Sequence, residues 1–154
     1  GLSGDKRVQV MRTLLQPSDY EYVLTRLNAL KGSQTRLWGT MTVGQMLQHC
    51  RRQVEMALGE IPTKPMFPRP IQWLSKITFG YYIPWSKNLV TAPEMVAKDD
   101  VAFDAEHEQL ISIISKFMES DEFHPHPIFG HLTKEDWGLI IYKHLDHHLR
   151  QFGT

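Results

Sequence analysis

Cysteine is almost absent from this sequence. The 154 residues include one cysteine, Cys50, so a disulfide within the chain is excluded. A chain of this length can bury a sizeable core without cross-links, and a lack of disulfides is typical of a reducing compartment. We therefore expect a single domain over residues 1–154 and a cytoplasmic location.

An excess of charge of either sign is also missing. The chain has 17 basic and 17 acidic residues, which gives a formal net charge of +0. Nucleic-acid-binding domains usually carry a basic excess. No apolar run approaches the roughly 18 residues that span a bilayer, and Lys6 and Arg7 are not followed by the apolar stretch of a signal peptide. The sequence thus predicts no nucleic-acid partner and no membrane partner.

A convincing strand pattern is absent too, and apolar residues recur instead at helical spacing. Four amphipathic segments stand out, at about 18–31, 43–58, 103–119 and 133–152. Amphipathic helices in this number bury their apolar stripes against one another. We predict an all-α fold, a four-helix bundle, preceded by an irregular arm over residues 1–16.

Capping pairs mark three of the predicted helix starts. A hydroxyl residue followed three positions later by an acid or an amide satisfies two backbone N–H groups reciprocally. The pairs are Ser18 and Glu21, Thr42 and Gln45, and Thr133 and Asp136.

Proline is concentrated between the second and third predicted helices. The prolines from Pro62 to Pro70 exclude regular helix and central strand there. Residues 71–82 can form a short helix, and the region is too aromatic for a disordered linker. We predict a long proline-rich crossover, containing this short helix, that packs over the bundle.

Histidine is concentrated in the last predicted helix. Three of the eight histidines, His144, His147 and His148, fall within five residues. At about 100° per residue, His144 and His148 lie in the middle of the apolar stripe and His147 lies at its edge. Two imidazoles at i and i+4 on one buried face suit a metal ion. The alternative is a pair of core histidines satisfied by hydrogen bonds.

A third ligand would come from another helix. Catalytic zinc sites take about three protein ligands and leave one position open. His49, at the edge of its apolar stripe, and His107, inside its stripe as a core or pocket-wall residue, are the candidates. Nitrogen ligands suit a divalent transition metal, of which zinc or nickel is the first expectation and iron the next. Gln151, one turn beyond His148, could hydrogen-bond a ligand or a coordinated water.

Other notable residues have simpler readings. Cys50 falls on an apolar stripe and is expected to be buried as a small hydrophobe. Residues 123–132 include three histidines that are expected to shape a turn. The four tryptophans are expected in the core or in a pocket wall: Trp38, Trp73, Trp85 and Trp137.

Two motifs point to a family. The second helix contains MLQH, which ends at His49, and the last helix contains His144-x-x-x-His148 followed by Gln151. With these motifs, residues 17–153 resemble the DinB-like superfamily of metal-binding four-helix bundles. The segments HPIFGHLTKEDW and KHLDHHLRQFG resemble one branch of it that is described as a domain of unknown function.

The resemblance implies a ligand set. The superfamily triad maps onto three residues of this chain: His49, His144 and His148. It favours His49 over His107 as third ligand, and it leaves His107, His147 and Gln151 as candidates for the surrounding pocket. Where many superfamily members have Arg-Gly-Gln after the last histidine, this chain has Leu149, Arg150 and Gln151.

The resemblance also implies an activity class. Some superfamily members resemble thiol-dependent transferases or isomerases, so we expect a metal-dependent enzyme in which the ion activates water or a thiol. Hydrolysis or thiol-dependent group transfer on a small-molecule substrate would follow, in a protein that forms a homodimer. The alternatives are a non-catalytic, stress-associated bundle that binds a small molecule or a metal, or a dimerisation module whose interface buries Trp73 and Phe79.

Overall fold

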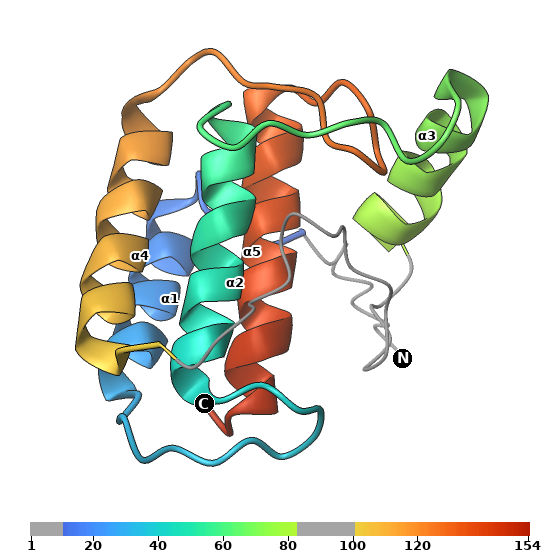
Figure 1. The fold of residues 1–154 in the computed structure, drawn as a ribbon. Coiled ribbons are helices and arrows are strands. Elements are labelled where there is room, and N and C mark those ends of the chain that lie inside the picture. Colours follow the sequence, from blue (N-terminus) through green and yellow to red (C-terminus); the bar gives the residue numbers. More distant parts are fainter. Residues whose placement is uncertain (1–10, 83–100) are drawn as a thin grey trace, which may run out of the picture.

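The part of the chain that the computed structural model describes, residues 11–82 and 101–154, is mostly helical (Figure 1). It contains no strand within these ranges, and one isolated bridge joins His126 to Gly130. Four long helices lie side by side, and two short elements stand at one side of them. The elements are α1 (Pro17–Ala29), α2 (Val43–Ala57), α3 (Arg69–Ser75), the π-helix η1 (Lys76–Tyr82), α4 (Phe103–Glu119) and α5 (Lys134–Gln151).

The core lies between the four long helices. α2 packs against both α4 and α5, and α1 packs against α5. The largest fully buried side chains include Trp137, Phe117 and Phe152. Burying one large apolar side chain contributes about 1.5–3 kcal/mol to folding. These contacts hold α2 and α5 next to each other along their length.

Two of the three predicted capping pairs are confirmed. At the start of α2, the backbone N–H of Gln45 donates to Thr42 Oγ1 at 3.2 Å, and the Thr42 N–H donates to Gln45 Oε1 at 2.9 Å. At the start of α5, Thr133 and Asp136 form the same reciprocal pair, with distances of 3.1 and 3.0 Å. The two helices that carry the histidine motifs therefore begin where the sequence predicts.

The predicted cap of the first helix is wrong. The sequence predicted Ser18 as the N-cap, with Glu21 as its capping partner. In the structure α1 begins at Pro17, so the N-cap is Gln16, which makes no side-chain capping bond. Proline is favoured in the first turn because its fixed φ suits the helix and its missing N–H leaves no donor unsatisfied. Asp19 Oδ2 accepts the Thr13 N–H at 3.1 Å, which ties the first turn of α1 to the segment before it.

The segment before α1 is irregular and is fastened to α5. Leu14 is fully buried, and its N–H donates to the Gly138 carbonyl at 3.2 Å. A Cβ on Gly138 would lie 2.6 Å from Thr13 Oγ1, so the glycine lets the segment approach the helix. The rest of the predicted arm, residues 1–10, lies outside the described residues.

The short helix predicted within residues 71–82 exists as α3 followed by η1, which packs on α5. Lys76 Nζ lies 3.0 Å from Asp136 Oδ2, and Lys143 Nζ donates to the Phe79 carbonyl at 2.6 Å. Residues 83–100 lie outside the described ranges, so the crossover as a whole stays a prediction.

The tryptophans divide between interior and surface. Trp137 is buried and Trp38 is half-buried, but Trp73 is 64% exposed, so its predicted burial is wrong. Trp73 lies on α3, a helix without a buried residue. Trp85 lies outside the described residues. Among the helices of the described residues, none combines the length and the apolarity needed to cross a membrane.

The caps give a matched test of helix stability. We expect Thr42→Ala to lower the free energy of unfolding by about 1 kcal/mol, because the N–H of Gln45 loses its acceptor. Ser18→Ala is the control, since Ser18 is exposed and caps nothing. Urea denaturation of both variants measures the difference, and equal losses in the two would contradict the assignment.

Candidate metal centre

Three histidines from two helices meet in the core. His49 comes from α2, and His144 and His148 come from successive turns of α5. One ring nitrogen from each lies within 4.8 Å of the others. The side chains are only 4%, 5% and 8% exposed, respectively. The packing of α2 on α5 thus brings together residues that are almost a hundred positions apart in the sequence.

The rings present nitrogen edges to one another. Nε2 of His144 lies 2.8 Å from Nε2 of His49. The ring centroids are 4.7 Å apart for His49 with each of the other two and 4.6 Å apart for His144 with His148, all edge-on. In a tetrahedral zinc site with Zn–N bonds of about 2.0–2.1 Å, the ligand nitrogens lie about 3.3 Å apart. The cluster has this scale, so the three histidines could hold a metal ion.

Burial keeps the α5 histidines neutral. Desolvation lowers the pKa of His144 well below its usual value, and the neighbouring His148 and His49 add to the effect. Desolvation also lowers the pKa of His148, to about 3. Neutral imidazole is the form that binds metals, so at neutral pH no proton competes with a metal ion for the ring lone pairs of His144 and His148.

Gln151 determines which nitrogen of His148 faces the cluster. Gln151 Nε2 donates to the Trp38 carbonyl at 2.9 Å, and a carbonyl accepts only, so the orientation of the amide is defined. Gln151 Oε1 then lies 2.8 Å from His148 Nδ1, which must carry the proton and donate. The lone pair of His148 is therefore on Nε2. Such bonds from behind a ligand orient its ring and raise its basicity.

Gly39 makes room for this arrangement. Its φ is +80°, a left-handed conformation that favours glycine. A Cβ at this position would lie 2.5 Å from Gln151 Nε2. The Leu37 N–H also donates to the Gln151 carbonyl, at 2.7 Å, so the loop before α2 is fastened to the end of α5. The sequence did not predict this role of Gly39, for which the only signal was a glycine beside a tryptophan.

Comparison with protein-family models gives a match over most of the chain. The sequence matches the family described as "Protein of unknown function (DUF1569)" over residues 10–154. The chain belongs to the DUF1569 family. Comparison with curated proteins and with solved structures gives no match. The expectation of a domain of unknown function is thereby confirmed.

Two other predicted residues of the DUF1569 chain lie apart from the three nitrogens. His147 packs edge-on against Trp38 at 5.8 Å and against His148 at 5.0 Å, so it forms a wall beside the cluster. Burial lowers the pKa of His147, and Arg150 lowers it further. His107 lies on α4 with its Nε2 2.9 Å from the Leu27 carbonyl, which joins α4 to α1. Of the two candidate third ligands, the structure brings His49 to the pair.

Cys50 belongs to the core, as predicted. It is fully buried beside Met46, with 3.8 Å between the two sulfur atoms. Burial raises the pKa of its thiol, so the reactive thiolate form is disfavoured.

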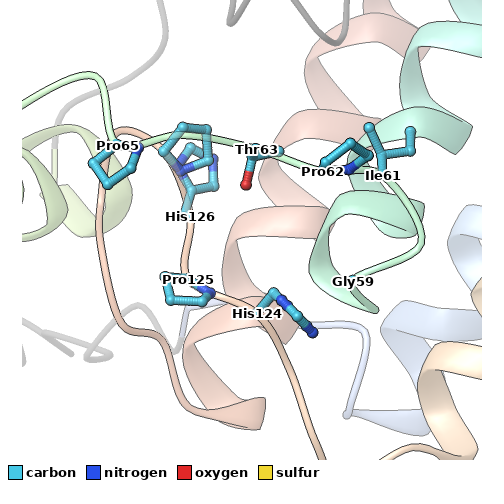
Figure 2. A pocket seen from close by; sticks show the side chains of 9 residues that line it. Gly59, Ile61, Pro62, Thr63, Pro65, His124, Pro125 and His126 are labelled. Carbon is cyan, nitrogen blue, oxygen red and sulfur yellow. The ribbon is translucent and has the colours of Figure 1, made fainter.

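The loop histidines shape a turn and a separate pocket. His126 Nδ1 accepts the N–H groups of Ile128 and Phe129 at 3.0 and 3.2 Å, which confirms the predicted structural role of this ring. His124 and His126 also line a pocket of about 380 Å³ together with Gly59 and several prolines (Figure 2). None of the three clustered histidines lines this pocket.

The bond between Gln151 and His148 can be tested without any ion. We expect one His148 tautomer, protonated on Nδ1, in nitrogen-15 NMR spectra of the metal-free protein. Gln151→Leu should give a mixture of tautomers and weaken metal binding about 10–100-fold in chelator competition. Gln109→Leu, at an exposed position of α4, is the matched control. A single unchanged tautomer in Gln151→Leu would contradict the assignment.

His126 predicts an acid dependence of stability. Burial lowers the pKa of His126 to about 3 from an unfolded value of 6.5. Between pH 6.5 and about 3, His126 is protonated in the unfolded chain but not in the folded protein. The free energy of unfolding therefore falls as the pH drops through this range. His126→Asn keeps an acceptor for the turn and removes the titration, which should reduce the slope by as much as about 1.4 kcal/mol per pH unit.

Urea denaturation between about pH 4 and 7 measures this slope. His131→Asn is the control, because it makes the same substitution at a histidine whose side chain is exposed. Identical slopes for the parent protein and His126→Asn would show that His126 is not a source of the dependence.

Proposed function

We propose that this DUF1569 protein is a metal-dependent enzyme that holds a divalent transition metal on His49, His144 and His148. The observation that carries the proposal is the meeting of three buried ring nitrogens within 4.8 Å. Polar rings cost free energy when they leave water unless they gain strong interactions. An ion shared by the three rings supplies that interaction, and the lowered pKa values of His144 and His148 leave those two rings neutral and able to bind it.

The residues around the proposed ion have different roles. A bound ion of this kind supplies Lewis acidity, which lowers the pKa of a coordinated water or thiol so that it acts as a nucleophile near neutral pH. Gln151 holds the ring of His148 with its lone pair toward the cluster. His147 and Trp38 form one wall, which limits the access of bulk water. The chemistry that fits is hydrolysis or thiol-dependent group transfer on a small molecule.

The three nitrogen ligands limit which metal the site would bind. Three neutral imidazoles suit zinc or nickel first and iron next, because calcium and magnesium prefer oxygen ligands. Neutral ligands also leave the full positive charge of the ion in place, which strengthens its effect on the pKa of a coordinated group.

Several features support a wider relationship. The side-by-side arrangement of α1, α2, α4 and α5 and the histidine spacing on α2 and α5 favour a DinB-like four-helix bundle with a long crossover between α2 and α4. Thiol-dependent transfer is an expectation drawn from that likeness. A homodimer in the cytoplasm belongs to the same proposal.

A non-catalytic role is the second candidate, and the depth of the cluster favours it. None of the three histidines is more than 8% exposed, so little of the cluster is open to a substrate. A closed site would hold a structural ion, in a protein that binds rather than converts a small molecule.

Metal content tests the ligand assignment. We expect protein purified without metal-affinity resin to contain about one equivalent of a transition metal by mass spectrometry. His49→Ala and His144→Ala should each lose it, whereas His107→Ala should keep it, because His107 lies against Leu27. Zinc added to the metal-free protein should raise Tm in the parent and in His107→Ala but not in His144→Ala. Unchanged metal in both His49→Ala and His144→Ala would refute the triad.

The same protein separates an enzyme from a binder. Cobalt(II) in the site would report its coordination through its visible spectrum. An open position predicts a spectral change on adding a low-molecular-weight thiol. A spectrum that thiols and small anions leave unchanged would indicate a closed structural ion and would argue against the enzyme.

A further inference from the structure

The short helix α3 has no buried residue among its seven and exposes most of its surface. Ile71, Trp73 and Leu74 are nevertheless large and apolar, and they are 47%, 64% and 55% exposed. A helix this short has little stability of its own in water, and packing on the described part of the chain does not explain its exposed apolar side chains.

The helix turns its apolar side away from the protein. Measured from Ile71 at about 100° per residue, Leu74 lies at about 300° and Trp73 at about 200°, whereas Gln72 lies at about 100°. Gln72 contacts the body, because a Cβ on Gly130 would lie 2.8 Å from Gln72 Oε1. An ordinary surface helix buries its apolar side and exposes its polar one. In α3 this pattern is inverted.

Exposed apolar side chains are concentrated around this helix. Nine large hydrophobic residues of the described ranges are exposed, and six of them lie between residues 66 and 79. We name these six the α3 patch: Met66, Phe67, Ile71, Trp73, Leu74 and Phe79. Isolated exposed apolar residues are ordinary, but a group concentrated in one short segment indicates a binding surface.

The patch lies in a basic segment of a neutral chain. Residues 61–82 contain Lys64, Arg69 and Lys76 and no acidic residue. Lys64 and Arg69 are exposed, and neither belongs to an ion pair that the structure describes. Lys76 pairs with Asp136. A partner for this surface must therefore accept apolar side chains and present negative charge.

We propose that the α3 patch docks on an anionic lipid surface. Apolar side chains on a short exposed helix can enter the boundary between headgroups and acyl chains, where tryptophan is enriched. Lys64 and Arg69 would lie among the headgroups, each attracted to anionic lipid. Such docking needs no membrane-spanning segment, whose absence led the sequence to predict no membrane partner.

A second copy of the chain fits the surface less well. In a two-fold contact the same patch faces itself, so the interface would collect Lys64 and Arg69 of both copies, and residues 61–82 supply no acidic side chain to pair with them. α3 also stands away from the four long helices (Figure 1). A short helix that projects from the protein, as α3 does, can enter a deformable lipid surface more easily than it can pack against the same projecting helix of a second copy.

Vesicle sedimentation tests the proposal. We expect the protein to pellet with vesicles of phosphatidylcholine and phosphatidylserine, less so with phosphatidylcholine alone, and less at high salt. The double variant Trp73→Ser with Leu74→Ser should weaken binding on the order of tenfold or more. Leu37→Ser is the matched control, because Leu37 is 69% exposed but lies outside the patch. Lys64→Gln with Arg69→Gln should reduce the preference for anionic vesicles, and circular dichroism checks that each variant is folded.

Either of two kinds of result would overturn the proposal. One is a failure to pellet with anionic vesicles, or equal pelleting of the parent and the Trp73→Ser, Leu74→Ser variant. The other is a dimer by light scattering that this variant converts to monomer, which would assign the patch to a second copy.

Discussion

The contact between α2 and α5 is the constraint on which the candidate site depends. His144 and His148 are neighbours on one helix, but a triad requires His49 on the other. Nε2 of His49 lies 2.8 Å from Nε2 of His144, a separation that only close helix packing can produce. The confirmed caps at Thr42 and Thr133 define where each helix begins. A change in the start or rotation of either helix would separate the nitrogens.

The end of α5 is held by polar contacts as well as by the core. Arg26 of α1 is buried, and it donates to Asp146 Oδ1 at 2.7 Å and to the Thr154 carbonyl at 2.9 Å. Gln151 Nε2 donates to the Trp38 carbonyl in the loop before α2. Asp146 therefore anchors α5 to α1, while Gln151 ties it to the loop before α2. A helix held by both contacts has little freedom to rotate its histidines out of register.

The sequence predicted those features that depend on local pattern. The helical periodicity and the Thr42 and Thr133 caps are local, and they were confirmed. The i,i+4 spacing of His144 and His148 is also local, but only the resemblance, not spacing, selected His49 over His107. The structure supplies the reason: α4 turns His107 toward α1, whereas α2 turns His49 toward α5.

The features that the sequence did not predict depend on contacts between distant segments. Pro17 displaced the Ser18 cap because proline in the first turn outweighs a weak hydroxyl signal. The exposure of Trp73 could not be read from its type, since aromatic residues in a crossover usually pack on a core. The role of Gly39 depends on the position of Gln151, more than a hundred residues later.

The candidate metal centre and the segment that carries the α3 patch both contact α5. η1 joins α3 to the body through Lys76, which pairs with Asp136 of α5, and through the Phe79 carbonyl, which accepts from Lys143. Lys143 immediately precedes His144, and its pKa is lowered to about 8 by partial burial. α5 thus supports the π-helix on one side and two histidines of the cluster on another. Because α5 contacts η1 and also contains His144 and His148, its orientation links the position of the α3 patch to that of the candidate metal centre.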